Sequence, residues 1–127
     1  MILFDTNALL RYVLQDHQEM ADSVEQQLLN EVCYIPVEVV AEFIYVLMKV
    51  YGIDRKTVSQ TVTGIADIKT VRIAKNNVVR HAIEVFATSN FDFVDCLLIG
   101  YAKEKQYTIF TFDKKLQKHL NSALADF

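Results

Sequence analysis

Glycine, proline and cysteine are scarce in this chain. Its 127 residues include 3 Gly, 1 Pro and 2 Cys, while 52% are hydrophobic and 23% are charged. So few chain-breaking residues in an apolar chain of this length predict a single domain spanning residues 1–127, with little loop and no disordered tail. Cys33 and Cys96 form no CxxC motif or Cys/His cluster, which favours two buried thiols over a zinc site.

Other features that would mark particular classes of protein are also missing. The net charge of −3 gives no global attraction to nucleic acid, so such a partner would need a local basic patch. No apolar run reaches the length that crosses a bilayer. The N-terminal residues show neither the basic region nor the cleavage site of a secretory signal. We therefore expect a cytoplasmic protein that has no membrane partner.

Short β-rich runs alternate with segments of helical periodicity. We expect strands at residues 2–4, 32–35, 70–74 and 107–112. We expect helices at residues 8–14, 20–30, 36–50, 54–66, 76–87, 92–102 and 113–120. This alternation is typical of βαβ units and predicts an α/β fold, with a central, mainly parallel sheet flanked by helices on both faces.

Some helix boundaries carry specific signals. Asp16 and Glu19 have the spacing of a capping box that would open the second helix. Gly52 suits the position just after a helix, and Asp54 suits the N-cap of the next one.

An acidic residue begins the most apolar helix of the chain. Residues 96–102 are all apolar or small, which predicts a helix buried on every side. Asp95 would share a face with Leu98 and Ile99, and a carboxylate there needs a partner or a metal ion. A structural role is the alternative, with Asp92 as the N-cap and Asp95 as an acid in the first turn.

Three further acids have unusual settings. Asp5 and Asp113 each directly follow an expected strand, and ligands of open parallel sheets bind beyond the carboxyl ends of the strands. Glu42 is the only charged residue between Val39 and Met48, which predicts a side chain facing inward or into a cleft. The alternative for Glu42 is partial exposure with its stem packed on apolar surface.

These four acids, Asp5, Glu42, Asp95 and Asp113, would repel one another if they converged. At about 4 Å and an effective dielectric near 20, each pair costs roughly 4 kcal/mol. Protonation or a divalent cation would relieve this repulsion. Ligation by oxygen alone favours Mg²⁺ or Mn²⁺, and such ions can activate water for attack on a phosphodiester.

Four motifs together resemble the PIN-domain nucleases, and in particular the VapC toxins of toxin–antitoxin pairs. Their order and spacing run from residue 2 to about residue 116. The motifs are Phe4-Asp5-Thr6-Asn7-x-Leu9-Leu10-Arg11, Val40-x-Glu42-x-x-x-Val46-Leu47, Phe91-Asp92-Phe93-x-Asp95-x-Leu97-Leu98-Ile99 and Thr111-Phe112-Asp113.

The resemblance implies an endoribonuclease that depends on Mg²⁺ or Mn²⁺, in which Asp5, Glu42, Asp95 and Asp113 are the catalytic metal ligands. It also implies a homodimer that is silenced by a VapB-type antitoxin. By position, the supporting residues would be Thr6, Asn7, Asp92 and Thr111.

Basic residues near the expected site could hold RNA phosphates. The candidates are Arg11, Lys114 and Lys115, for which a solvated helix face is the alternative.

Two other readings remain open. Another acidic-site, metal-dependent phosphohydrolase is one, although a dehalogenase-type phosphatase would need a second acid where Asn7 stands. The other is a PIN-like interaction module without catalysis, which would not need four mutually repelling acids.

Overall fold

The structure, a computed structural model, describes residues 1–125. It contains two compact units, Met1–Asn76 and a second unit that begins at Asn77. The elements of the first unit are β1 (Ile2–Leu3), α1 (Thr6–Leu14), α2 (Gln18–Asn30), β2 (Cys33–Ile35), α3 (Val37–Lys49), α4 (Arg55–Ala66) and β3 (Val71–Ile73). Those that follow are α5 (Asn76–Thr88), α6 (Phe93–Lys105) and α7 (Lys114–Ala125). Over these 125 residues, no helix combines the length and apolarity needed to cross a membrane.

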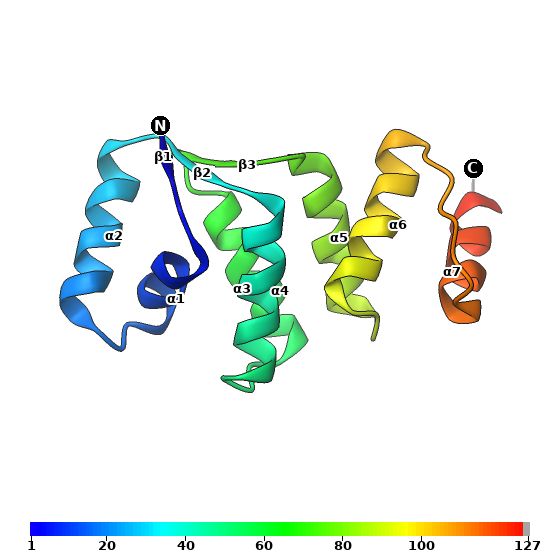
Figure 1. The fold of residues 1–127 in the computed structure, drawn as a ribbon, viewed down its shortest axis with the longest axis horizontal. Helices are drawn as coiled ribbons and strands as arrows, with labels where there is room; N and C mark the ends of the chain where they lie inside the picture. The colour runs from blue at the N-terminus through cyan, green and yellow to red at the C-terminus, as the bar shows by residue number, and fades with distance from the viewer. Residues whose placement is uncertain (126–127) are drawn as a thin grey trace. The chain divides into compact units, whose positions relative to one another are not determined.

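The strands of the first unit form a parallel sheet in the order β1-β2-β3. The N–H of Ile2 donates to the carbonyl of Val32 at 2.8 Å, and that of Phe4 to Tyr34 at 3.0 Å. Parallel neighbours need crossover connections, and here α1 and α2 join β1 to β2 while α3 and α4 join β2 to β3 (Figure 1). The prediction of an α/β fold with a parallel sheet is confirmed.

Several predicted helix boundaries are also confirmed. Gly52 has φ +66° and donates its N–H to the carbonyl of Met48 at 3.1 Å, which ends the turn after α3. The carboxylate of Asp54 accepts the N–H of Thr57 at 2.8 Å and so caps α4.

The predicted capping box of α2 is wrong. This helix begins at Gln18, and its cap is His17, whose Nδ1 accepts the N–H of Met20 at 3.2 Å. The carboxylate of Asp16 instead accepts a 2.7 Å hydrogen bond from Arg11. Asp16 therefore forms a salt bridge with Arg11 and does not cap α2.

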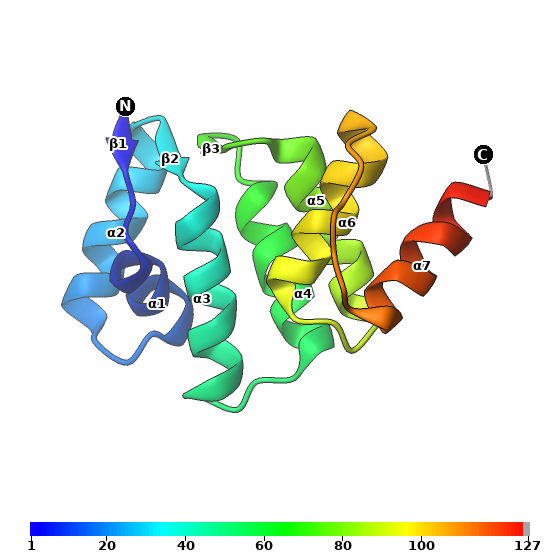
Figure 2. The same cartoon turned by 45° about the vertical axis from the view of Figure 1, so that its right-hand side comes forward.

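The predicted strand at residues 107–112 is also wrong, since the described chain forms neither helix nor strand there. The segment connects the end of α6 to the start of α7 (Figure 2). Within it, Phe110 and Phe112 are 87% and 84% exposed, and their rings pack edge to face with centres 5.3 Å apart. The composition favours extended backbone, but a strand also requires a neighbouring edge for its hydrogen bonds.

The apolar helix α6 is mostly buried, but Leu98 and Tyr101 are only half-buried, so the prediction of burial on every side is wrong. Cys96, Ile99 and Gly100 are inaccessible or nearly so, and the ring of Phe93 packs edge to face on Phe86 of α5 at 5.9 Å. Gly100 permits a close approach to α5, because a Cβ there would lie 2.6 Å from the carbonyl oxygen of Val78. A backbone atom at that distance cannot move aside without shifting a helix.

We therefore predict that Gly100→Ala lowers the free energy of unfolding by about 1–3 kcal/mol, the usual cost of overpacking a core. Gly64→Ala is the matched control, because a Cβ at this exposed site within α4 meets nothing within 4 Å. It should raise stability by about 0.5–1 kcal/mol through helix propensity. Urea unfolding of both variants measures the difference, and equal effects would contradict the close packing of α5 on α6.

Candidate functional site

Asp5 stands two residues after β1 and caps α1. Its Oδ1 accepts the N–H of Ala8 at 2.8 Å, and the side chain is exposed. Thr6 is buried at 9% exposure, whereas Asn7 is exposed. The sequence thus placed Asp5 correctly at the end of a strand, and the structure adds that one of its oxygens is held by a helix terminus.

Glu42 lies on the solvent-facing side of α3, so the prediction that it faces inward is wrong. Phe43, Ile44 and Leu47 take the buried side of this helix, and Tyr45 beside Glu42 is 62% exposed. Because α3 follows β2 and β2 pairs with β1, Glu42 and Asp5 both come after the carboxyl ends of neighbouring parallel strands.

Two acids lie in the first turn of α6. Asp92 is its N-cap, as the sequence predicts, and its Oδ1 accepts the N–H of Asp95 at 2.8 Å. Asp95 is half-buried, between exposed Val94 and fully buried Cys96. The apolar helix therefore holds the Asp95 carboxylate at its margin and not at its centre.

Asp113 opens α7 in a similar way. Its Oδ1 accepts the N–H of Leu116 at 2.9 Å, and its own N–H donates to the Thr111 hydroxyl at 3.0 Å. The carbonyl of Thr111 in turn accepts a 2.6 Å hydrogen bond from the Gln117 side chain. Thr111 therefore fixes the backbone that carries Asp113.

The acids of the second unit share one electrostatic environment. Burial raises the pKa of Asp95 above its usual value, and the negative charges of Asp92 and Asp113 raise it further. Lys115 acts in the opposite direction. These three carboxylates thus lie close enough to repel one another.

The four predicted metal ligands are divided between the two units. Asp5 and Glu42 belong to the first unit, and Asp95 and Asp113 to the second. Among residues 1–125, no three His, Cys, Asp or Glu side chains are placed so that they could hold a metal ion. Convergence of the four acids on one ion stays a prediction.

The three basic candidates differ in their contacts. Arg11 is bound to Asp16 at 2.7 Å and lies 3.5 Å from the Tyr51 hydroxyl, and both contacts raise its pKa. Lys115 donates to the Asn90 side chain and lies 4.6 Å from the centre of the Phe91 ring. Lys114 is exposed. Phe91 belongs to the third motif, but neither contact of Lys115 was predicted, because the sequence carries no signal for contacts between residues so far apart along the chain.

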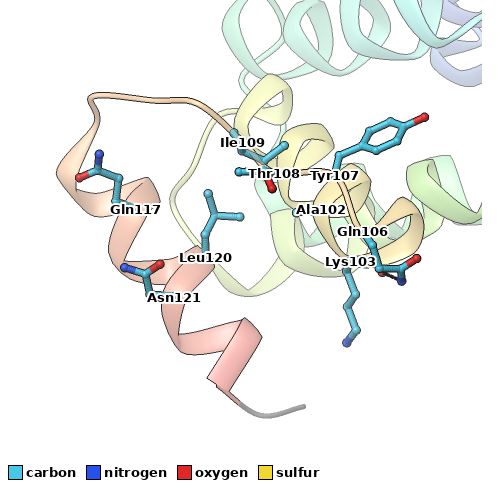
Figure 3. A pocket seen from close by; sticks show the side chains of 9 residues that line it. All are labelled: Ala102, Lys103, Gln106, Tyr107, Thr108, Ile109, Gln117, Leu120 and Asn121. Atoms are coloured by element: carbon cyan, nitrogen blue, oxygen red, sulfur yellow. Dashed lines mark hydrogen bonds between the residues drawn. The ribbon is translucent and has the colours of Figure 1, made fainter.

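A pocket of about 600 Å³ in the second unit holds none of these acids (Figure 3). It lies between the last turn of α6, the connection after it and α7. Its lining residues are Ala102, Lys103, Gln106, Tyr107, Thr108, Ile109, Gln117, Leu120 and Asn121. Asp92 and Asp95 lie at the start of α6, whereas this pocket lies at its end, so the pocket is separate from these two acids.

The raised pKa of Asp95 predicts how stability varies with pH. A carboxyl whose pKa is higher in the folded state contributes stability below its unfolded pKa, near 3.9, and loses it as the pH rises through the folded value. At neutral pH the ionised Asp95 therefore destabilises the metal-free protein. We predict that Asp95→Asn is more stable at pH 7, by about 0.5–1 kcal/mol, and that this gain vanishes near pH 4.

Urea unfolding at the two pH values, without divalent cations, measures this effect. Asp22→Asn, at an exposed position in α2, is the control and should show no such gain. A less stable Asp95→Asn at pH 7 would mean that the favourable interaction of an acid with the helix dipole outweighs the repulsion.

Comparison with known proteins agrees with the motifs. A VapC ribonuclease of Aquifex aeolicus (strain VF5) is 28% identical over 109 residues, which cover 82% of this chain and 80% of that protein. No solved structure gives a significant match. The family model of the PIN domain matches residues 2–120, which include parts of both units and all four predicted metal ligands. The chain therefore belongs to the PIN-domain family.

Proposed function

We propose that this protein is a VapC-type toxin, an endoribonuclease that hydrolyses RNA phosphodiesters with Mg²⁺ or Mn²⁺. The family match supports a nuclease in general terms. The cation is supported by one observation above all: Asp95 is half-buried in the field of Asp92 and Asp113, without an ion-pair partner among the described residues. A divalent cation would neutralise that charge.

The proposed metal ligands are Asp5, Glu42, Asp95 and Asp113, two from each unit, so both units would contribute to one PIN domain over residues 1–127. Their donor atoms are all carboxylate oxygens, which fit a hard cation such as Mg²⁺ or Mn²⁺. When bound, the cation supplies an activated water and stabilises the leaving oxygen of the phosphodiester.

The chain's own residues would orient the substrate and the ligands. Thr111 fixes the backbone of Asp113 through its hydroxyl, as a supporting residue should. Asp92 does the same for the first turn of α6, because it binds the N–H of Asp95. Thr6 and Asn7 would support Asp5 in the first unit. Lys114, Lys115 and Arg11 are the proposed contacts to RNA phosphates, and Arg11 would first have to leave Asp16.

We predict that Glu42→Gln and Asp95→Asn each reduce Mn²⁺-dependent RNA cleavage by about 100-fold or more, because a lost ligand weakens metal binding more than a lost supporting contact does. Glu38→Gln is the matched control, since Glu38 is also exposed on α3 and lies one turn before Glu42. Cleavage of a labelled single-stranded RNA and binding of Mn²⁺ by calorimetry are the measurements, and EDTA should abolish cleavage.

Acids in both units should affect the same metal. If Glu42→Gln and Asp95→Asn leave Mn²⁺ binding unchanged, the shared site is wrong. A wild-type protein that binds RNA but never cleaves it, with any divalent cation, would favour the alternative of an inactive interaction module. Cleavage of small phosphate esters but not of RNA would favour another phosphohydrolase.

We further propose that the protein acts in the cytoplasm as a homodimer and is silenced by a VapB-type antitoxin. The likeness to a VapC ribonuclease supports the antitoxin, and the homodimer and the location rest on the motif resemblance alone. We predict that expression of the wild-type chain arrests growth, that Asp95→Asn does not, and that co-expression of a small protein encoded beside this gene restores growth. Colony counts on inducing plates measure the effect, and arrest that no neighbouring gene relieves would contradict the antitoxin.

A further inference from the structure

Lys115 is held in place by residues from outside its own helix. It is the second residue of α7, and its Nζ donates to Oδ1 of Asn90, in the connection between α5 and α6. The same ammonium lies 4.6 Å from the centre of the Phe91 ring. An ammonium over the face of an aromatic ring is attracted by its negative quadrupole. Two different contacts thus restrain one side chain.

The ring beneath Lys115 is itself fixed. Phe91 is only 6% exposed. Its ring packs edge to face with the His119 ring, with ring centres 5.4 Å apart and an angle of 82° between the ring planes. His119 lies one turn after Lys115 on α7, so Phe91 packs against two successive turns of that helix. A lysine side chain loses rotamer entropy on being ordered, and here part of that loss has already occurred in the free protein.

The restrained ammonium lies beside the acids but is not paired with them. Asn90 and Phe91, which its Nζ contacts, directly precede the N-cap Asp92, and Asp113 stands two residues before Lys115. Among the described residues, however, the structure has no salt bridge within 4 Å between Lys115 and an acid. The neutral amide of Asn90 takes the contact instead. An ammonium has three donors, so its charge and two of its donors stay available to an anion.

The neighbouring lysines of α7 provide a contrast. Lys114 and Lys118 are exposed, and the described residues give neither of them a hydrogen bond, ion pair or ring contact. The arrangement around Lys115 is therefore specific to this position and is not a general property of a basic helix face.

We propose that Lys115 binds an RNA phosphate next to the acidic site, and that Asn90 and Phe91 are positioning residues that hold it there. This rests on the proposed ribonuclease function and names the residue that binds the substrate backbone. A phosphate is the matching ligand, because a phosphodiester that approaches the acids at the starts of α6 and α7 needs a fixed positive charge beside them.

Lys115→Met is the decisive variant, because methionine keeps an aliphatic chain against Phe91 and removes only the charge. We expect KM for a short, labelled, single-stranded RNA to rise about tenfold, with a much smaller change in kcat. The slope of log(kcat/KM) against log[KCl] should become shallower by about 0.7, the value of one contact to a single-strand phosphate. Mn²⁺ binding without RNA should not weaken.

Lys118→Met is the matched control, because Lys118 lies on the same helix and lacks the Asn90 and Phe91 contacts. It should keep the wild-type KM and salt slope. A purely structural role of Lys115 would lower the thermal midpoint and leave the salt slope unchanged, which would overturn the proposal.

The positioning role is tested by double-mutant cycles. Asn90→Ala and Phe91→Leu should each raise KM in the wild-type background and have no further effect in the Lys115→Met background. If Phe91→Leu fails to fold, Asn90→Ala decides alone, because Asn90 is exposed. Additive effects on KM would overturn the positioning role. Failure of the ribonuclease proposal is a separate result, since the wild-type protein would then not cleave the RNA at all.

Discussion

Like charges that lie close together are the main constraint on the second unit, and helix termini are the means of holding them. Asp5, Asp92 and Asp113 each accept a backbone N–H at the start of a helix. A helix N-terminus carries a partial positive charge, which favours an acid there by about 0.3–1 kcal/mol. Repulsion between two acids at close range is larger than this. The caps therefore fix the carboxylates without neutralising them.

Asp54 shows what an isolated cap does. Its carboxylate binds the N–H and hydroxyl of Thr57, and these hydrogen bonds lower its pKa. The pKa of Asp95 is raised instead, although this acid too lies near a helix N-terminus, in the first turn of α6. The difference comes from its surroundings, because burial and two neighbouring acids disfavour its charged form. Hydrogen bonds at a helix terminus explain the lowered pKa of Asp54, but they do not explain the raised pKa of Asp95.

Local signals in the sequence predicted what depends on local structure. Asp54, Asp92 and Gly52 mark helix boundaries correctly, because caps involve residues only a few positions apart. The strand at residues 107–112 was predicted wrongly, because a strand requires a partner edge that no propensity describes. Glu42 was predicted to face inward from its apolar neighbours, yet the buried side of α3 runs through Phe43, Ile44 and Leu47. The hydrogen bond from Lys115 to Asn90 joins residues 25 positions apart, so it depends on tertiary structure and has no local signal in the sequence.

The caps also bear on which cation would suit the proposed site. In Asp5 and Asp113, two of the proposed ligands, Oδ1 accepts a backbone N–H, which leaves the other oxygen of each carboxylate for the proposed cation. Ca²⁺ accepts bidentate carboxylates and up to eight oxygens, whereas Mg²⁺ keeps several waters and binds few carboxylates in near-octahedral geometry. Single oxygens presented from rigid helix starts match the smaller ion. In the proposed site, ligands held in this way would therefore suit Mg²⁺ better than Ca²⁺.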